Sequence, residues 1–126
     1  MTDAVSLTRR ELDIMSVLWR RGSATVAEVR DDLVDDLAYP TVQTMLRVLE
    51  GKGYVGHIVD GRAFRFRALV EQDAAADSAL GRLVAKVYHG SRELLVSRLL
   101  ADEDISADEL RRIKKLLQKR LDEASR

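Results

Sequence analysis

The sequence predicts a mainly α-helical protein with one small β-hairpin near its middle. Apolar residues recur at helical spacing along most of the 126-residue chain. Around residues 54–68 the apolar period instead shortens to two, on either side of an Asp60-Gly61 turn. Residues 71–126 return to helical patterns without a strand signal. We therefore expect two domains, residues 1–70 and residues 71–126.

Composition limits the chemistry that the chain can perform. Hydrophobic residues make up 46% of the chain and aromatic residues 5%, so the core must be mainly aliphatic. The formal net charge is zero, which gives no overall field to attract nucleic acid. Cysteine is absent, which excludes disulfides and thiolate metal ligands. Neither a signal peptide in Met1–Val5 nor an apolar run near the ~20 residues of a membrane span is present, so we expect a cytoplasmic protein without direct membrane contact.

Two helices are predicted before residue 35, each opened by a capping box. Thr8 with Glu11 begins the first, and Thr25 with Glu28 begins the second, a short helix. The first helix should end at Gly22, and the second near Leu33 or Val34. The apolar residues that we expect to face inward are Leu12, Met15, Leu18 and Trp19 in the first helix and Val26, Val29 and Leu33 in the second.

The third helix, Tyr39–Glu50, has an apolar face and an outward polar face. Pro40 suits its first turn, where a missing N–H costs nothing. Its inward residues at i, i+3, i+4 and i+7 are Val42, Met45, Leu46 and Leu49, and its outward residues are Thr41, Gln43, Thr44 and Arg47. Hydroxyl, amide and guanidinium groups on one face are what reading base edges and phosphates requires. Following a short helix and a brief turn, this helix occupies the recognition position of a helix-turn-helix.

The hairpin after this helix resembles the wing of a winged helix-turn-helix. Alternation places Phe64 and Phe66 on a face toward the helices, and Arg65 and Arg67 on the opposite face. Arg62 lies at the hairpin tip. His57, in the first strand, has no second ligand at metal spacing, so we expect it to have a structural role or to contact phosphate.

Basic charge is concentrated where DNA contacts are expected. Residues 40–67 carry five basic side chains against two acidic ones, in a chain of zero net charge. An ordinary solvated surface is the alternative explanation for such a stretch. The predicted DNA-contact residues are Thr41, Gln43, Thr44, Arg47, Lys52, Arg62, Arg65 and Arg67.

Three amphipathic helices follow, and their apolar faces exceed what one short chain can bury. We predict the first over Asp73–His89, with Ala76 among its inward residues, the second after a Ser91 cap, and the third after a capping box of Ser106 and Glu109. A second copy of the chain is the expected cover, and an intramolecular helical subdomain is the alternative. The predicted dimerisation residues are Leu80, Leu83, Val87, Leu95, Leu99, Leu110, Ile113, Leu117 and Leu121.

These features together resemble the penicillinase-repressor family (BlaI/MecI/CopY type) of bacterial transcriptional repressors. The resemblance covers nearly the whole chain. Its segments are Leu7–Met15 with Leu18-Trp19, Thr41–Leu46 with Leu49, Lys52 and Gly53, Gly61–Phe66, Leu94–Val96, and Glu103–Ser106 with Glu109-Leu110. It implies a winged-helix domain, a helical dimerisation domain and a dyad-symmetric DNA operator. In β-lactam-responsive members it also implies a membrane-bound sensor metalloprotease as upstream partner, and cleavage within the dimerisation region.

The chain departs from this family pattern at two places. The copper-responsive branch carries a C-terminal cysteine cluster, which this sequence lacks. The β-lactam-responsive members carry an Asn-Phe scissile pair a few residues before the Glu103–Ser106 segment. Arg98-Leu99 stands at the equivalent positions here, so the family's protease specificity does not transfer directly.

The predicted function is that of a dimeric DNA-binding repressor without a cofactor. The alternative, from another class, is a winged-helix module that binds protein through its C-terminal helices. An enzyme finds little support, because the two histidines are far apart and no Gly-rich phosphate loop or paired catalytic carboxylates are present. Four aspartates at residues 31, 32, 35 and 36 are expected to form a solvated loop rather than a metal site.

Overall fold

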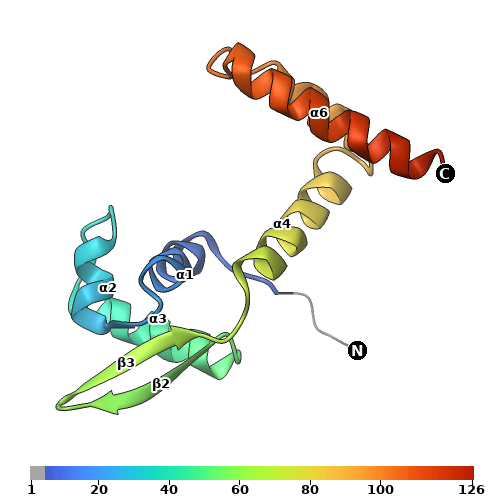
Figure 1. Cartoon of the computed structure of the whole chain (residues 1–126). Coiled ribbons are helices and arrows are strands. Elements are labelled where there is room, and N and C mark those ends of the chain that lie inside the picture. Colours follow the sequence, from blue (N-terminus) through green and yellow to red (C-terminus); the bar gives the residue numbers. More distant parts are fainter. Residues whose placement is uncertain (1–4) are drawn as a thin grey trace. The chain divides into compact units, whose positions relative to one another are not determined.

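The computed structural model describes residues 5–126. The expectation that Met1–Val5 form no signal peptide therefore falls mostly outside the described residues. It divides into two compact units, Met1–Gly81 and Arg82–Arg126. The predicted boundary between residues 70 and 71 lies just before the helix that joins these units. The elements in order are α1 (Arg9–Arg21), β1 (Ala24–Thr25), α2 (Val26–Asp32), α3 (Tyr39–Gly51), β2 (Val55–Asp60), β3 (Ala63–Ala68), α4 (Gln72–Lys86), α5 (Arg92–Leu100) and α6 (Ala107–Ala124) (Figure 1).

The capping boxes predicted at the starts of α1 and α2 both form. The Thr8 hydroxyl accepts from the Glu11 amide at 3.1 Å, and the Glu11 carboxylate accepts from the Thr8 amide at 2.9 Å. Thr25 and Glu28 make the same reciprocal pair at 3.2 and 2.9 Å. Each box satisfies two amides that a helix start otherwise leaves unpaired, so these two helix starts are set by local sequence.

The buried stripe of α1 differs from the predicted one. Met15 and Leu18 are buried as expected, but Leu12 is 43% exposed. Ile14 and Val17 are buried in its place, so the stripe is centred on Ile14, Met15 and Leu18. Trp19 packs against the edge of the core, and its indole N–H donates to the Val70 carbonyl at 3.0 Å. Helix α1 carries apolar residues on more than one side, so sequence spacing alone did not select the right face.

The hairpin is part of a three-stranded antiparallel sheet with the order β1-β3-β2. The two-residue strand β1 was not predicted from the sequence. It pairs Ala24 with Phe66 and Thr25 with Arg65. The β2–β3 turn consists of Gly61 and Arg62, because Asp60 pairs with Ala63. The predicted Asp60-Gly61 turn was therefore wrong by one residue. Gly61 has a φ of 64°, which suits the first position of a two-residue hairpin turn.

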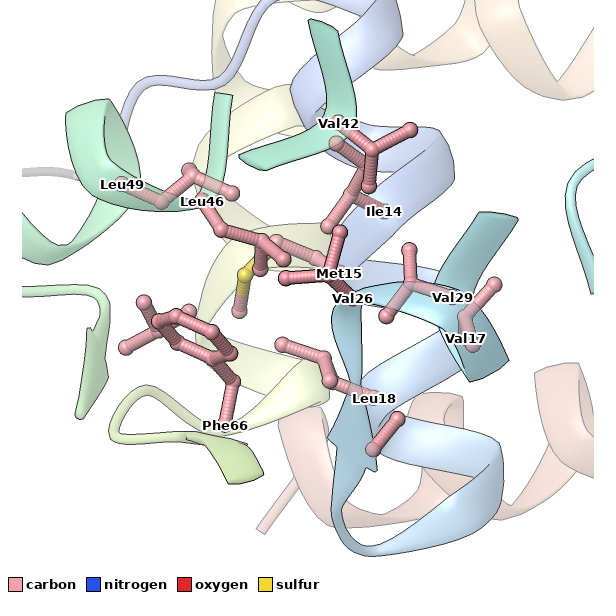
Figure 2. Packing of buried hydrophobic residues seen from close by; sticks show 12 residues of the cluster. Ile14, Met15, Val17, Leu18, Val26, Val29, Val42, Leu46, Leu49 and Phe66 are labelled. Carbon is pink, nitrogen blue, oxygen red and sulfur yellow. The ribbon is translucent and has the colours of Figure 1, made fainter. Parts of the chain in front are cut away.

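The core of the first unit joins α1, α2, α3 and the sheet. Phe66 of β3 lies among side chains of α1 and α3, including Met15 and Leu46 (Figure 2). The α3 residues Val42, Leu46 and Leu49 have no measurable exposure, as their helical spacing predicted, and Met45 is half-buried at the edge. Since three consecutive turns of α3 insert into this core, the opposite face of α3 is held toward solvent.

The second unit contains helices whose apolar residues lie largely at the surface. Neither α5 nor α6 has a buried residue. Helix α4, which begins in the first unit, ends at Lys86, earlier than the predicted His89. In its first-unit part it buries Ala75 rather than the predicted Ala76. The hydroxyls of Ser91 and Ser106 cap α5 and α6, each accepting at 3.1 Å from an amide three residues on. The capping box predicted at Ser106 is only half formed among the described residues, because the Glu109 carboxylate does not accept from the Ser106 amide. Within residues 5–126 no helix is long and apolar enough to cross a membrane.

Candidate nucleic-acid interface

The solvent face of α3 presents most of the predicted polar side chains. Thr41, Thr44 and Arg47 are exposed, whereas Gln43 is half-buried. Within residues 5–126, Arg47 has no ion-pair partner. Its guanidinium can therefore meet a guanine edge or a phosphate without first leaving a carboxylate.

Val48 adds an apolar group to this face that the sequence reading did not single out. Its side chain is 48% exposed, although the core residues Leu46 and Leu49 lie close to it in sequence. Thr44 and Thr41 stand four and seven residues before Val48, so the three side chains follow one another along the helix. An exposed methyl group among hydroxyls suits contact with the 5-methyl of thymine. The exposure of Val48 is consistent with its place in the sequence, because it falls outside the spacing of Val42, Leu46 and Leu49.

The start of α3 is arranged differently from the starts of α1 and α2. Ala38 is its N-cap residue, so no side chain bonds the first amides. Pro40 lies in the first turn as predicted. The Arg30 guanidinium stands 5.9 Å from the centre of the Tyr39 ring, beside this helix start. Arg30 and Tyr39 were not among the predicted contacts, because they become neighbours only when α2 packs near α3.

The three arginines of the wing lie in different environments. Arg62 and Arg67 are exposed, and neither has an ion pair among residues 5–126. Arg65 is bonded on two sides, to Asp60 at 3.0 Å and to Glu28 of α2 at 3.1 Å. The bond to Asp60, followed by the charge of Glu28, raises the pKa of Arg65. Arg65 thus links β3 to the N-terminal turn of α2, a role that alternation along the strand did not reveal.

Phe64 was predicted to pack on the helices, and this prediction was wrong. Phe64 is 47% exposed and stacks on His57, with ring centres 4.3 Å apart and planes inclined by 24°. The Nδ1 atom of His57 pairs with the carboxylate of Glu50, at the end of α3. The core extends along β3 only as far as Phe66, so Phe64 lies beyond the helices. His57 therefore connects the wing to α3.

Lys52, another predicted DNA contact, is bonded to a buried carboxylate. Its ammonium lies 2.8 and 3.0 Å from the two oxygens of Glu11. The side chain of Lys52 remains 41% exposed, whereas that of Glu11 is only 6% exposed. Burial acts to raise the pKa of Glu11, but the bonds from Lys52 and Thr8 together outweigh it, and the pKa is lowered.

We expect the Glu11 pair to make folding sensitive to acid. A carboxyl whose pKa is lower in the folded chain than in the unfolded chain stabilises the fold above the unfolded pKa. This contribution is lost as the pH falls through the folded pKa, because the unfolded chain binds the proton first. Thermal unfolding followed by circular dichroism from pH 7 to pH 3 should show a steeper loss of Tm for the wild type than for Glu11→Gln. If Tm falls equally with pH in the wild type and in Glu11→Gln, the Glu11 carboxylate does not make this contribution to stability.

The acidic residues around the end of α2 form ion pairs. Asp32 bonds Arg21 at 2.6 Å, and Asp35 pairs with Arg10. Among residues 5–126, no group of three histidine, cysteine, aspartate or glutamate residues is placed to hold a metal ion. Asp32 and Asp35 thus fasten α2 and the following loop to α1 rather than converging on a cation.

The arrangement of α2, α3 and the β2–β3 hairpin is that of a winged helix-turn-helix protein. Comparison with known families agrees, because the penicillinase repressor family matches residues 7–119. The chain belongs to this family. Methicillin resistance regulatory protein MecI of Staphylococcus aureus strain N315 is 24% identical in an alignment of 116 residues that covers 90% of this chain and 94% of MecI. The penicillinase repressor of Bacillus licheniformis is 26% identical over 110 residues, 86% of each chain.

Solved structures agree with this fold. The solution structure of the DNA-binding domain of the repressor BlaI is 29% identical, with a TM-score of 0.51, and covers 59% of this chain and 93% of that domain. The monomeric form of Bacillus licheniformis BlaI bound to the blaP half-operator matches with 29% identity and a TM-score of 0.50, at the same coverage. A MarR family protein of Bacillus stearothermophilus, 21% identical with a TM-score of 0.52, covers 97% of this chain and 78% of its own, and shows likeness of fold alone.

Proposed function

We propose that this chain is a dimeric repressor that binds a dyad-symmetric operator in double-stranded DNA. Helix α3 lies in the major groove, and the wing contacts backbone phosphates beside it. The observation that carries the proposal is the exposed face of α3, on which Thr44 and Arg47 stand opposite a fully buried apolar stripe. In support, the related BlaI of Bacillus licheniformis has been solved with a half-operator. A cytoplasmic location and a non-enzymatic role follow from this function.

The proposed roles divide the contact residues by chemistry. Thr41, Gln43, Thr44 and Arg47 contact base edges or flanking phosphates. Arg62 and Arg67 supply phosphate contacts from the wing. Arg65 reaches a phosphate only by exchanging Glu28 or Asp60 for it. Lys52 is bonded to Glu11, and while that ion pair holds it makes no phosphate contact.

Dimerisation is proposed to occur through the C-terminal helices. Leu117 and Leu121 of α6 are 66% and 54% exposed in the single chain, and Leu99 of α5 is 60% exposed. So much apolar surface is normally covered in a working protein. The predicted interface is the exposed or half-buried set of Leu80, Leu83, Val87, Leu95, Leu99, Leu110, Ile113, Leu117 and Leu121.

Release from DNA is proposed to follow loss of the dimer. Arg98 and Leu99, the residues equivalent to the family's scissile pair, lie in the last turns of α5. A cut there separates α6 from the DNA-binding unit and uncouples the two half-sites. A membrane-bound sensor metalloprotease is the proposed upstream partner. Mixing the chain with such a protease and locating the cut by mass spectrometry tests this step, and an intact Arg98-Leu99 bond would contradict it.

We expect the wing arginines to contribute affinity without sequence preference. Replacing Arg62 and Arg67 with glutamine should weaken binding to all duplexes alike, because phosphates carry no base information. The slope of log affinity against log salt should fall by about one for each lost contact. Titrations by fluorescence anisotropy at several salt concentrations measure both effects. An unchanged slope would show that the wing does not touch DNA.

The direct test of the proposed function is occupancy of DNA in the host cell. Crosslinking followed by sequencing should place the chain at a few promoter sites, and the purified chain should retard those fragments with steep salt dependence. Failure to retard any enriched fragment would instead favour the protein-docking role considered for this fold.

A further inference from the structure

Glu11 occupies a position where the fold calls for an apolar side chain. It stands at i in the i, i+3, i+4, i+7 stripe that continues with Ile14, Met15 and Leu18, all of them buried. At 4% exposure, Glu11 is the one buried charged residue within residues 5–126. Burying a carboxylate is costly unless it is paired and hydrogen-bonded, so its presence calls for an explanation beyond packing.

The partners of Glu11 connect the start of α1 to the end of α3. Oε1 accepts from the Thr8 amide at 2.9 Å and from the Lys52 ammonium at 3.0 Å, and Oε2 accepts from Lys52 at 2.8 Å. Lys52 is the C-cap residue of α3. The ion pair thus joins two elements that are 41 residues apart in sequence, and the carboxylate has both oxygens bonded.

A second set of bonds fixes the same end of α3. The Ser6 amide donates to the Tyr54 hydroxyl at 3.0 Å, again joining the N-terminal segment to the residues after α3. The Tyr54 amide donates back to the Leu49 carbonyl at 3.0 Å, and Gly53 takes a φ of 83° to allow that turn. At the other end of α3, the N-cap residue Ala38 provides no side-chain hydrogen bond. The polar anchoring of α3 is therefore concentrated at its C-terminal end.

We propose that Glu11 is a positioning residue for DNA reading: through Lys52 it fixes the C-terminal end of α3, and so places Arg47 and Thr44 against the bases. The proposal rests on the proposed repressor function. Arg47 stands five residues before Lys52, about 7.5 Å along the helix axis at 1.5 Å per residue. Binding groups must be held to within about 0.5 Å to be productive. A pivot so near Arg47 therefore governs base contacts more than phosphate contacts.

The competing role is a direct phosphate contact by Lys52, and it predicts effects of opposite sign. If Lys52 must leave Glu11 to reach DNA, removing the carboxylate charge frees the ammonium and tightens binding to every duplex. If Lys52 positions α3, the same change loosens α3 and weakens binding to the preferred sequence alone. Glu11→Gln separates the two roles, because glutamine keeps an oxygen acceptor for Thr8 and removes the charge.

The experiment uses the full chain and a duplex enriched from a random library by the wild type, with a scrambled duplex of equal length for comparison. Glu11→Gln and Lys52→Met should each bind the enriched duplex about tenfold more weakly, the loss of one base contact. Their affinity for the scrambled duplex, and the slope of log affinity against log salt, should stay at the wild-type values. Glu71→Gln makes the same charge change at an exposed site of the same unit and should alter neither affinity.

Tighter binding by Glu11→Gln, or equal weakening on both duplexes by Lys52→Met with a shallower salt slope, would overturn the proposal. Circular dichroism establishes that each variant is folded at the temperature of measurement. Should a single variant unfold, Glu11→Leu with Lys52→Met replaces the pair by apolar groups, an exchange that folds well in other proteins. This double variant should show the same selective loss, and unchanged discrimination would overturn the proposal. A wild type that enriches no sequence would instead refute the proposed function itself.

Discussion

Replacing Thr44 and Arg47 together with alanine should abolish specific operator binding while leaving the fold intact. Both side chains are exposed on α3, and neither belongs to the stripe of Val42, Leu46 and Leu49 that enters the core. Each good base contact is worth about 1–3 kcal/mol, so losing two should reduce specific affinity by about 30-fold or more. Competition between an enriched duplex and a scrambled one, followed by anisotropy, measures the loss.

Arg9→Ala is the matched control for this double variant. Arg9 is an exposed arginine at the start of α1, outside α3 and the wing. Its loss removes one positive charge without touching the proposed reading face, and it should leave discrimination between the two duplexes unchanged. If the folded Thr44 and Arg47 double variant distinguishes the enriched from the scrambled duplex as well as the wild type does, α3 is not the helix that contacts the bases.

Introducing two aspartates into the apolar face of α6 should convert the protein to a monomer with much weaker operator binding. Leu117→Asp with Leu121→Asp places charges where 66% and 54% of each side chain is exposed in the single chain. Coupling two half-sites raises affinity through effective concentration by about 10²–10⁴-fold. Loss of the dimer should remove most of that gain. Sedimentation velocity measures the oligomeric state, and operator titrations measure the affinity.

The control for this pair lies on the polar side of the same helix. Lys115→Asp with Lys119→Asp makes a larger change in charge on exposed residues that are not in the predicted interface. It should leave the chain dimeric. A wild type that sediments as a monomer, or aspartate variants of Leu117 and Leu121 that remain dimeric, would contradict an interface on this face.

The features predicted correctly from the sequence are those set by nearby residues. Thr8 and Thr25 with their glutamates fix two helix starts within one turn, so their reciprocal bonds are readable from sequence alone. The inward stripe of α3 was predicted because Val42, Leu46 and Leu49 fall on one side of that helix, with Val48 as the exception on the opposite side. Family membership was likewise predicted from short segments in a fixed order, and the match over residues 7–119 confirms it.

The features that were not predicted from the sequence depend on packing between distant segments. Strand β1 has two residues, too few for any period, and it exists because Phe66 and Arg65 offer an edge to pair with. The predicted face of α1 was wrong at Leu12, since several sides of that helix are apolar. Arg65 and Lys52 could not be recognised as ion-pair partners, because Glu28 and Glu11 lie 37 and 41 residues away. Phe64 is exposed because the core ends at Phe66.

Selection of duplexes from a random library by the full wild-type chain tests the central claim most directly. A dimer that reads DNA through two copies of α3 should enrich an inverted repeat. The centres of its half-sites should lie one or more helical turns apart, at about 10–10.5 base pairs per turn. Sedimentation should find two chains on each enriched duplex. A single unrepeated motif bound by one chain, or no enrichment at all, would contradict the account.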